Sequence, residues 1–226
     1  MSRFVPLQLK MHDGRPLPHT FFEGEGAGLL IVLPGLHYGS DGPVLYHLAK
    51  QLQTAGWDTL GLMYGFQASV AVPWTDHVAE ILAECEAAAR EAMGRRAYPR
   101  LGFVGKSLGS IVLAQLCANG AVPDGATAAY LTPPMGNPLF DSTFVATRQP
   151  AYIAIGTADS FYSEQAVAEL RARRPALVRV VKDADHGLDV PGDLAASLRA
   201  VGQVVEDASS FFLTGEIPGL EGAARP

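Results

Sequence analysis

Segments rich in apolar residues recur along the chain and predict buried β-strands. The run at 28–33 is uninterrupted, which suits a parallel strand covered on both faces. Similar or alternating segments predict further strands around 101–105 and at 58–64, 127–131, 151–157 and 176–181. Near the beginning of the chain, residues 4–11 and 19–25 flank a turn at 12–16, and they predict two short antiparallel strands at one edge of the sheet.

Between these strands, apolar residues return at the spacing of an α-helix. The pattern predicts helices over 43–55, about 74–93, the segment from 108 to about 119, 163–174 and about 193–212. Ser40 is the expected N-cap of the first helix, and Gly56 is its stop signal. In the last helix, one stripe is expected to face the core: Leu194, Leu198, Val201, Val205, Ala208 and Phe212. Residues 135–149 are expected to form a short irregular excursion.

Strands that alternate with helices predict the α/β class, with a mostly parallel central sheet and helices on both faces. We expect a single domain over residues 1–226, of which about 213–226 form a loose C-terminal tail. The segment between the strands at 127–131 and 151–157 is too short for a separate lid domain. The site is therefore expected to be open and shallow, and suited to small or exposed substrates.

Composition narrows the possible partners. The net charge is −6 and 48% of residues are hydrophobic, so we expect a soluble protein with no nucleic-acid partner. No apolar run approaches the ~20 residues of a membrane span, and the chain begins without the apolar segment of a signal peptide. We therefore expect a cytoplasmic protein with no membrane partner. Cys85 and Cys117 lie on predicted helices, where buried free thiols are the simplest interpretation.

The stretch around Ser107 has the pattern of a sharp turn between a strand and a helix. The sequence Gly105-Lys-Ser107-Leu-Gly109 follows an apolar strand and leads into an apolar helix. Such a turn strains the backbone of its central residue and projects the serine hydroxyl from the end of the sheet. Gly105 and Gly109 fit because strand and helix crowd those positions. Ordinary turns also carry this motif, but the flanking elements favour a nucleophile.

A serine nucleophile needs a base, which is usually a histidine oriented by a carboxylate. In an open α/β sheet, groups that act together lie at the C-terminal ends of the strands. Asp159 follows the strand at 151–157, and His186 follows the strand at 176–181. The chain order Ser107, Asp159, His186 is the one expected of this kind of sheet.

Other interpretations of these residues stay open at this point. Asp159 would also suit a turn or a helix cap, and a single loop histidine is often a surface residue. Asp183 and Asp185 compete for His186, although residues adjacent in sequence are poorly directed toward its ring. Asp141 is the carboxylate near the end of the preceding strand, where the chain has Thr132-Pro-Pro.

The oxyanion of an acyl-transfer intermediate needs two backbone N–H donors. We expect one from Leu108, directly after the nucleophile, and the other from Leu36, with Gly35 letting the backbone come close. Several nearby side chains would line a substrate pocket or pack under the loops: His37, Tyr38, Phe66, Trp74, Met135 and Phe161. The other histidines show no ligand spacing, and no phosphate-binding glycine loop is present, so we expect no metal and no cofactor.

Together, four stretches make the chain resemble the α/β-hydrolase superfamily: Leu33-Pro-Gly-Leu36, Gly105-Lys-Ser-Leu-Gly109, Gly156-Thr-Ala-Asp159 and Ala184-Asp-His-Gly187. The resemblance implies Ser107 as nucleophile, His186 as base and Asp159 as the residue that orients it. Many members have His-Gly in the oxyanion loop, where this chain has Pro34-Gly35. The compact outline without a lid is similar to the dienelactone-hydrolase-like branch, whose type enzyme uses cysteine at the position of Ser107.

The sequence thus predicts a serine hydrolase that cleaves small carboxylic esters or thioesters through an acyl-enzyme. One alternative is a ligand-binding protein that keeps the fold and turns its ligand over slowly or not at all. Another is a different bond within the same superfamily, such as an amide, a C–C bond or a peracid, because the fold does not decide the bond.

Overall fold

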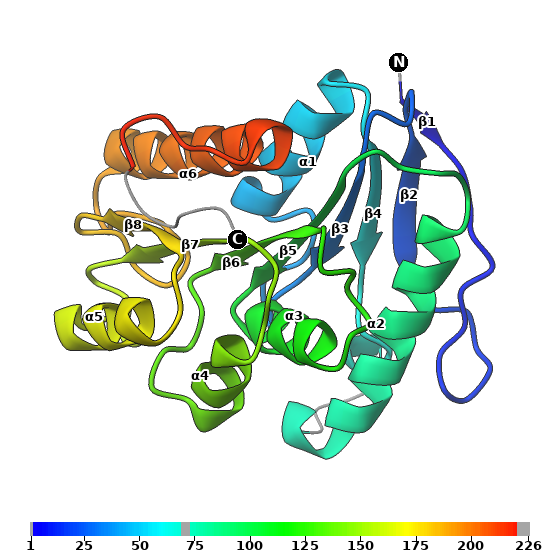
Figure 1. The fold of residues 1–226 in the computed structure, drawn as a ribbon, viewed down its shortest axis with the longest axis horizontal. Coiled ribbons are helices and arrows are strands. Elements are labelled where there is room, and N and C mark those ends of the chain that lie inside the picture. The colour runs from blue at the N-terminus through cyan, green and yellow to red at the C-terminus, as the bar shows by residue number, and fades with distance from the viewer. Residues whose placement is uncertain (1, 69–72, 221–226) are drawn as a thin grey trace.

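The described strands form one eight-stranded sheet in the order β1-β2-β4-β3-β5-β6-β7-β8 (Figure 1). The computed structural model describes residues 2–68 and 73–220. The strands are β1 (Arg3–Phe4), β2 (His19–Glu23), β3 (Leu29–Leu33), β4 (Asp58–Leu62), β5 (Leu101–Lys106), β6 (Thr127–Leu131), β7 (Ala151–Gly156) and β8 (Leu177–Val181). Strands β3 to β8 pair in parallel, whereas β1 and β2 add an antiparallel edge.

Helices cover both faces of this sheet. They are α1 (Pro43–Thr54), α2 (Val78–Met93), α3 (Leu108–Ala118), α4 (Pro138–Val145), α5 (Glu164–Arg173) and α6 (Leu194–Thr214), with short 3₁₀ helices η1 (Gly65–Ala68) and η2 (Trp74–His77). In Figure 1, α1 and α6 lie on one face, and α2 to α5 lie on the other. The predicted α/β class with a mostly parallel sheet is confirmed.

The central strand β3 shows why this layering is stable. All five of its residues are buried, and they divide between the two faces. Leu29, Ile31 and Leu33 belong to the core under α2 and α3, while Leu30 and Val32 belong to the core under α1 and α6. Because successive side chains of a strand point to opposite faces, an uninterrupted apolar run is what a doubly covered strand requires.

The strand expected at 4–11 is wrong beyond its first residue. Only Arg3–Phe4 pairs with β2, and a single bridge joins Lys10 to Pro16. Pro6 has no N–H for a ladder, and the Leu7 N–H donates to the ring Nε2 of His19 at 3.1 Å. The segment still packs on the core, because Leu7, Leu9 and Met11 are buried.

The irregular excursion expected at 135–149 contains a helix instead. The Asn137 side chain accepts a hydrogen bond from Leu139 N at 2.9 Å, and Pro138 occupies the first helical position. This is a standard helix start, in which a cap residue is followed by proline. Phe140 and Phe144 then face the core from α4.

Two helix starts also differ from expectation. Ser40 does not cap α1; the N-cap is Gly42, without a side-chain cap bond, and Pro43 begins the helix. The helix expected from 74 begins as the 3₁₀ turn η2, and α2 starts at Val78.

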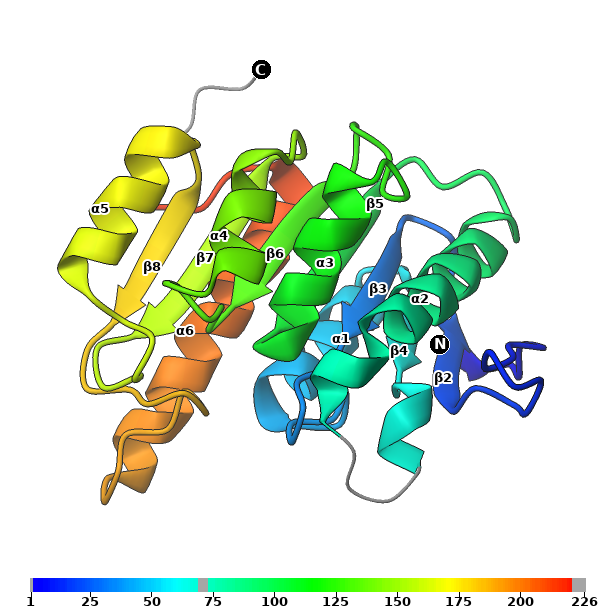
Figure 2. The same cartoon turned by 90° about the horizontal axis from the view of Figure 1, so that it is seen from below.

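The last helix, α6, is longer than the helix predicted over about 193–212, and its first turns are less buried than the predicted stripe implies. Leu194 and Leu198 are exposed, and the buried stripe begins with Ser197, Ala200 and Val201. Figure 2 shows the reason, because the first turns of α6 extend past the ends of β7 and β8. At the other end, α6 continues to Thr214 and the Ile217 side chain is buried. Between these points residues 214–216 are exposed, and residues 221–226 of the expected tail lie outside the described residues. Among the residues described, no helix has both the length and the apolar character to cross a bilayer.

Candidate active site

Ser107 occupies a strained turn between β5 and α3. Its φ is +53° and its ψ is −112°, a backbone conformation that L-residues rarely adopt. Two glycines make the turn possible. A Cβ atom on Gly105 would lie 2.3 Å from Gly109 O, and one on Gly109 would lie 2.1 Å from Leu33 O. Only glycine fits either position, so the motif read in the sequence has the steric basis expected of it.

His186 joins the serine to a buried carboxylate. Its Nε2 lies 2.8 Å from Ser107 Oγ, and its Nδ1 lies 2.8 Å from Asp159 Oδ2. An ionised carboxylate only accepts, so the proton of a neutral ring stands on Nδ1, and Nε2 is left to accept from the serine hydroxyl. The His186 side chain is 38% exposed, whereas that of Asp159 is fully buried. The arrangement holds one nitrogen of the ring ready to receive a proton from Ser107.

The ends of β7 and β8 bring these two residues together. The strands are in register up to Gly156 and Val181, so the loops that follow leave the sheet side by side. A Cβ atom on Gly156 would lie 1.9 Å from Ala184 O, and this close approach lets the loop after β8 cross over the end of β7. The Ala158 N–H donates to the same carbonyl at 2.9 Å.

The competing carboxylates have other partners. Asp185 Oδ1 accepts from the backbone N–H groups of Gly187 and Asp189, which shapes the loop around His186. Asp183 is exposed and lies 3.9 Å from Lys182 Nζ. Asp141 accepts from Gly136 N beside α4. The structure brings Asp159, and none of these three, to the imidazole.

Of the two expected oxyanion donors, Leu108 directly follows Ser107, and Leu36 belongs to a loop that reaches the serine at Gly35. Leu108 is the first residue of α3, where helix N–H groups point out of the helix end. Leu36 lies in the loop after β3, and a Cβ atom on Gly35 would be only 3.5 Å from Ser107 Cβ. This separation is ordinary van der Waals contact, so the loop after β3 lies directly beside the serine.

The buried ammonium of Lys106, for which the sequence predicts no role, connects three parts of the site. Its Nζ donates to Thr132 Oγ1 and to His186 O, each at 2.5 Å, and lies 4.8 Å from the centre of the Tyr38 ring. Burial lowers the pKa of Lys106 from its ordinary value of 10.5 to about 8, against the opposing charges of Asp159 and two neighbouring aspartates. A lysine directly before the serine was the signal available in the sequence.

The six expected pocket residues have varied surroundings. Phe161 lies edge-on to His186, with ring centres 5.4 Å apart. The Tyr38 hydroxyl accepts from Val44 N at the start of α1, and its ring contacts Lys106. His37 is exposed. Met135 is buried in the core. Phe66 and Trp74 are partly buried and pack against the same core. A role in substrate binding stays a prediction for all six.

The two cysteines lie in the core. Both are buried free thiols, and burial raises the pKa of Cys85 and of Cys117. Among the described residues, no three side chains of His, Cys, Asp or Glu gather in a way that could hold a metal ion.

A model of the alpha/beta hydrolase domain matches residues 30–213, most of the chain. Among solved structures, a dienelactone hydrolase from Anabaena variabilis is 16% identical, with a TM-score of 0.71 over 94% of this chain and 97% of that one. A serine hydrolase without a lid from Xanthomonas campestris is 18% identical, with a TM-score of 0.67 over 100% and 97% of the two chains. The esterase domain of a Rhodothermus marinus protein is 14% identical, with a TM-score of 0.65 over 93% and 97%. No curated protein compared with the chain matches it.

Proposed function

The chain belongs to the alpha/beta hydrolase family, and we propose that it is a serine hydrolase that cleaves small carboxylic esters or thioesters through an acyl-enzyme. One observation carries the proposal: Ser107 Oγ, the His186 ring and the Asp159 carboxylate form a continuous chain of two 2.8 Å contacts. A nucleophile, a base and a group that orients the base are what acyl transfer by serine requires.

The reaction follows from this arrangement. Ser107 Oγ bonds to the carbonyl carbon of the substrate while its proton passes to His186 Nε2. The buried Asp159 carboxylate stabilises the imidazolium that results. His186 then gives the proton to the departing alcohol or thiol, which leaves an acyl group on Ser107. A water molecule repeats the two steps, with His186 again taking and returning a proton, and releases the carboxylic acid.

The negative charge on the carbonyl oxygen is held by the N–H groups of Leu108 and Leu36. These donors contribute mainly in the transition state, when the oxygen becomes charged. Loss of one such donor typically costs on the order of 3 kcal/mol of transition-state stabilisation. The helix dipole of α3 adds a favourable field at the same point.

Two considerations support the substrate class. Two of the similar structures, a dienelactone hydrolase and an esterase domain, share the fold over nearly the full chain. The His186 ring is 38% exposed, so water and small substrates have access to it. We expect short acyl groups to be cleaved faster than long ones.

A fluorophosphonate probe and short-chain p-nitrophenyl esters test the proposal together. The wild-type protein should be labelled at Ser107 and should release p-nitrophenol. Ser107→Ala should abolish labelling and lower turnover by about three orders of magnitude or more, with the melting temperature unchanged. The matched control is Ser163→Ala, which removes the exposed N-cap serine of α5 and should leave both signals intact.

Two other results would have clear meanings. Turnover that survives Ser107→Ala would overturn the assignment of the nucleophile. Full labelling of the wild type without turnover of any ester or thioester in a panel of acyl and alcohol groups would favour the slow-turnover binding protein.

A further inference from the structure

Three successive carbonyl groups of the loop after β3 are held by side chains from the segment that follows β4. The Tyr64 hydroxyl donates to Pro34 O at 2.7 Å. The amide nitrogen of Gln67, Nε2, donates to Gly35 O at 3.1 Å and to Leu36 O at 2.7 Å. We call Tyr64 and Gln67 the loop clamp.

The clamp determines the direction of the Leu36 N–H. Gly35 O and Leu36 N belong to one peptide group, and in a trans peptide the C=O and the N–H point in opposite directions. When Gln67 holds the carbonyl on one side, the N–H must face the other side. The preceding amide is already used, because Gly35 N donates to Tyr38 O at 2.8 Å. We propose that Gln67 and Tyr64 are positioning residues that set the Leu36 N–H for the oxyanion, an inference that rests on the proposed function.

The orientation of the Gln67 amide is itself determined. Its Oε1 accepts from Tyr64 N at 3.2 Å, so its Nε2 is the atom that faces the loop. The Gln67 N–H donates to Tyr64 O at 3.0 Å, which closes a tight turn between the two clamp residues. The Tyr64 ring is buried and stacks on Phe66. A rigid turn of this kind limits how far the amide can rotate.

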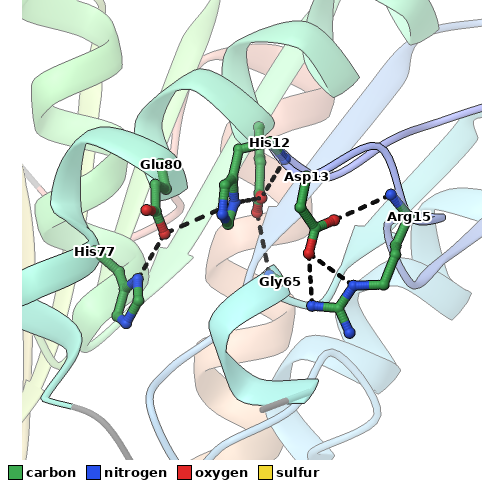
Figure 3. A network of polar contacts seen from close by, with 7 residues as sticks. His12, Asp13, Arg15, Gly65, His77 and Glu80 are labelled. Atoms are coloured by element: carbon green, nitrogen blue, oxygen red, sulfur yellow. Dashed lines mark hydrogen bonds and ion pairs between the residues drawn. The ribbon is translucent and has the colours of Figure 1, made fainter.

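A buried carboxylate anchors this turn to α2. Glu84 is 5% exposed, and its Oε2 accepts from Gly65 N at 3.1 Å at the start of η1. Its Oε1 accepts from His12 N at 3.0 Å and lies 3.1 Å from the His12 ring. Figure 3 shows this network, with Gly65 close to the residues contributed by α2 and by the N-terminal segment. The clamp is therefore fastened to a helix and not only to its own loop.

The position of the donor matters because its interaction with the oxygen becomes strong only as negative charge develops. A Leu36 N–H that points even moderately away loses transition-state stabilisation, while ground-state binding of the substrate changes little. Loss of the clamp should therefore lower kcat and leave KM nearly unchanged. A side chain with only a packing role would not separate the two constants in this way.

Gln67→Met tests the inference, and Gln149→Met is its matched control. Gln149 is also a glutamine whose Nε2 donates to two successive carbonyls, Val122 O at 2.9 Å and Pro123 O at 3.5 Å, but it lies outside the site. We expect Gln67→Met to lower kcat about tenfold or more, part of the 10²–10³ that loss of a whole oxyanion donor costs. KM should stay within about twofold. Gln149→Met should lower the melting temperature without changing kcat.

Gln67→Glu separates the amide from the shape of the side chain. At pH 8 its carboxylate would face two carbonyl oxygens and have no hydrogen to donate. It should be as slow as Gln67→Met, whereas a role in packing alone would leave it near wild type. Tyr64→Phe removes one bond from the clamp and should have a smaller effect in the same direction. A boronic acid that forms a tetrahedral adduct on Ser107 should lose affinity in parallel with kcat.

Hydrogen exchange gives a readout that does not depend on turnover. Amides of residues 35–38 should exchange faster in Gln67→Met than in wild type or in Gln149→Met. Wild-type kcat in both Gln67 variants, or unchanged exchange in this loop, would overturn the clamp. A wild-type protein that neither hydrolyses esters nor reacts with the fluorophosphonate would overturn the proposed function and with it the catalytic role of the clamp. The exchange rates would then still decide whether Gln67 holds the loop.

Discussion

Two fully buried aspartate side chains stand at opposite ends of the parallel sheet, and they differ in the partner that each one meets. Asp58 begins β4, and Asp159 follows β7. Asp58 accepts from Gly24 N at 2.8 Å and from the Tyr98 hydroxyl at 2.7 Å, and it lies 3.4 Å from Arg96. Burial and the contact with Asp58 raise the pKa of Tyr98, so this hydroxyl keeps its proton and remains a donor.

Asp159 meets a titratable ring instead. It accepts from Phe161 N at 3.0 Å and from His186, whose other nitrogen contacts Ser107. Arg96 is a fixed cation, whereas an imidazole can accept a proton at one nitrogen and return it. The difference teaches that burial and pairing of a carboxylate do not by themselves mark a functional site. What distinguishes the proposed site is a partner that can accept a proton and that contacts a serine hydroxyl.

The largest effect is expected when the carboxylate of the site is changed to its amide. Asp159→Asn keeps the shape but stabilises the wrong tautomer of His186, so turnover of p-nitrophenyl esters should fall by about 10⁴-fold. The melting temperature should change little, because the asparagine side chain has the same shape and its oxygen can still accept from Phe161 N. Steady-state kinetics and calorimetry measure the two quantities, and activity near that of wild type would remove Asp159 from the mechanism.

The same substitution at the other end of the sheet should have the opposite consequence. Asp58→Asn removes the buried charge that accepts from Gly24 N and from the Tyr98 hydroxyl, while Arg96 keeps Glu23 at 3.0 Å. It should lower the free energy of unfolding by about 2–3 kcal/mol, the scale of hydrogen bonds to a charged group. Turnover should stay at the wild-type value, since Asp58 lies at the far end of the strands from Ser107. Urea denaturation and ester kinetics on one preparation test both statements. A loss of turnover in folded protein would contradict the division between the two ends.

Lys106 extends the comparison to a buried cation whose charge depends on pH. Its pKa is about 8 in the folded protein against an ordinary value of 10.5, because burial disfavours the ammonium. Between these values the unfolded chain binds a proton that the folded protein does not, so folding stability gains as pH rises from 8 to 10.5.

The measurement compares wild type with Lys106→Met in urea at pH 7.5 and pH 10. The stability of the wild type relative to the variant should improve at the higher pH by a difference on the order of 3 kcal/mol. A difference between the two proteins that does not change with pH would show that Lys106 keeps its ordinary pKa.

The smallest effect is expected at His12, whose partner Glu84 is a third buried carboxylate. The hydrogen bond to Glu84 raises the pKa of His12 above its ordinary value of 6.5. The added stability is present below pH 6.5 and is lost as the pH rises through the raised value. His12→Gln should therefore lower the melting temperature more at pH 5.5 than at pH 8.

Turnover at a fixed pH should be nearly unaffected by His12→Gln, because the partners of the His12 ring are Glu80 and Glu84 rather than a nucleophile. Equal losses of melting temperature at both pH values would contradict the raised pKa.

Local sequence was sufficient for most of the sheet and for the turn at Ser107. The apolar run 28–33 predicts a strand covered on both faces without any tertiary information, and β3 is such a strand. The strand expected at 4–11 failed because pairing at an edge depends on backbone donors, and Pro6 supplies none. The predicted burial of Leu194 and Leu198 at the start of α6 is wrong, because an apolar stripe does not reveal where the sheet beneath it ends.

The sequence by itself determined the strained turn, because Gly105, Ser107 and Gly109 lie within one turn and their spacing already requires the close approach of strand and helix. Only the tertiary structure decided that Asp159, and not Asp183 or Asp185, contacts the imidazole, and that Gln67 holds the loop beside Ser107. These contacts join residues 27 to 32 positions apart. The directions of such side chains follow from the paths of loops over the end of the sheet, which no local pattern encodes.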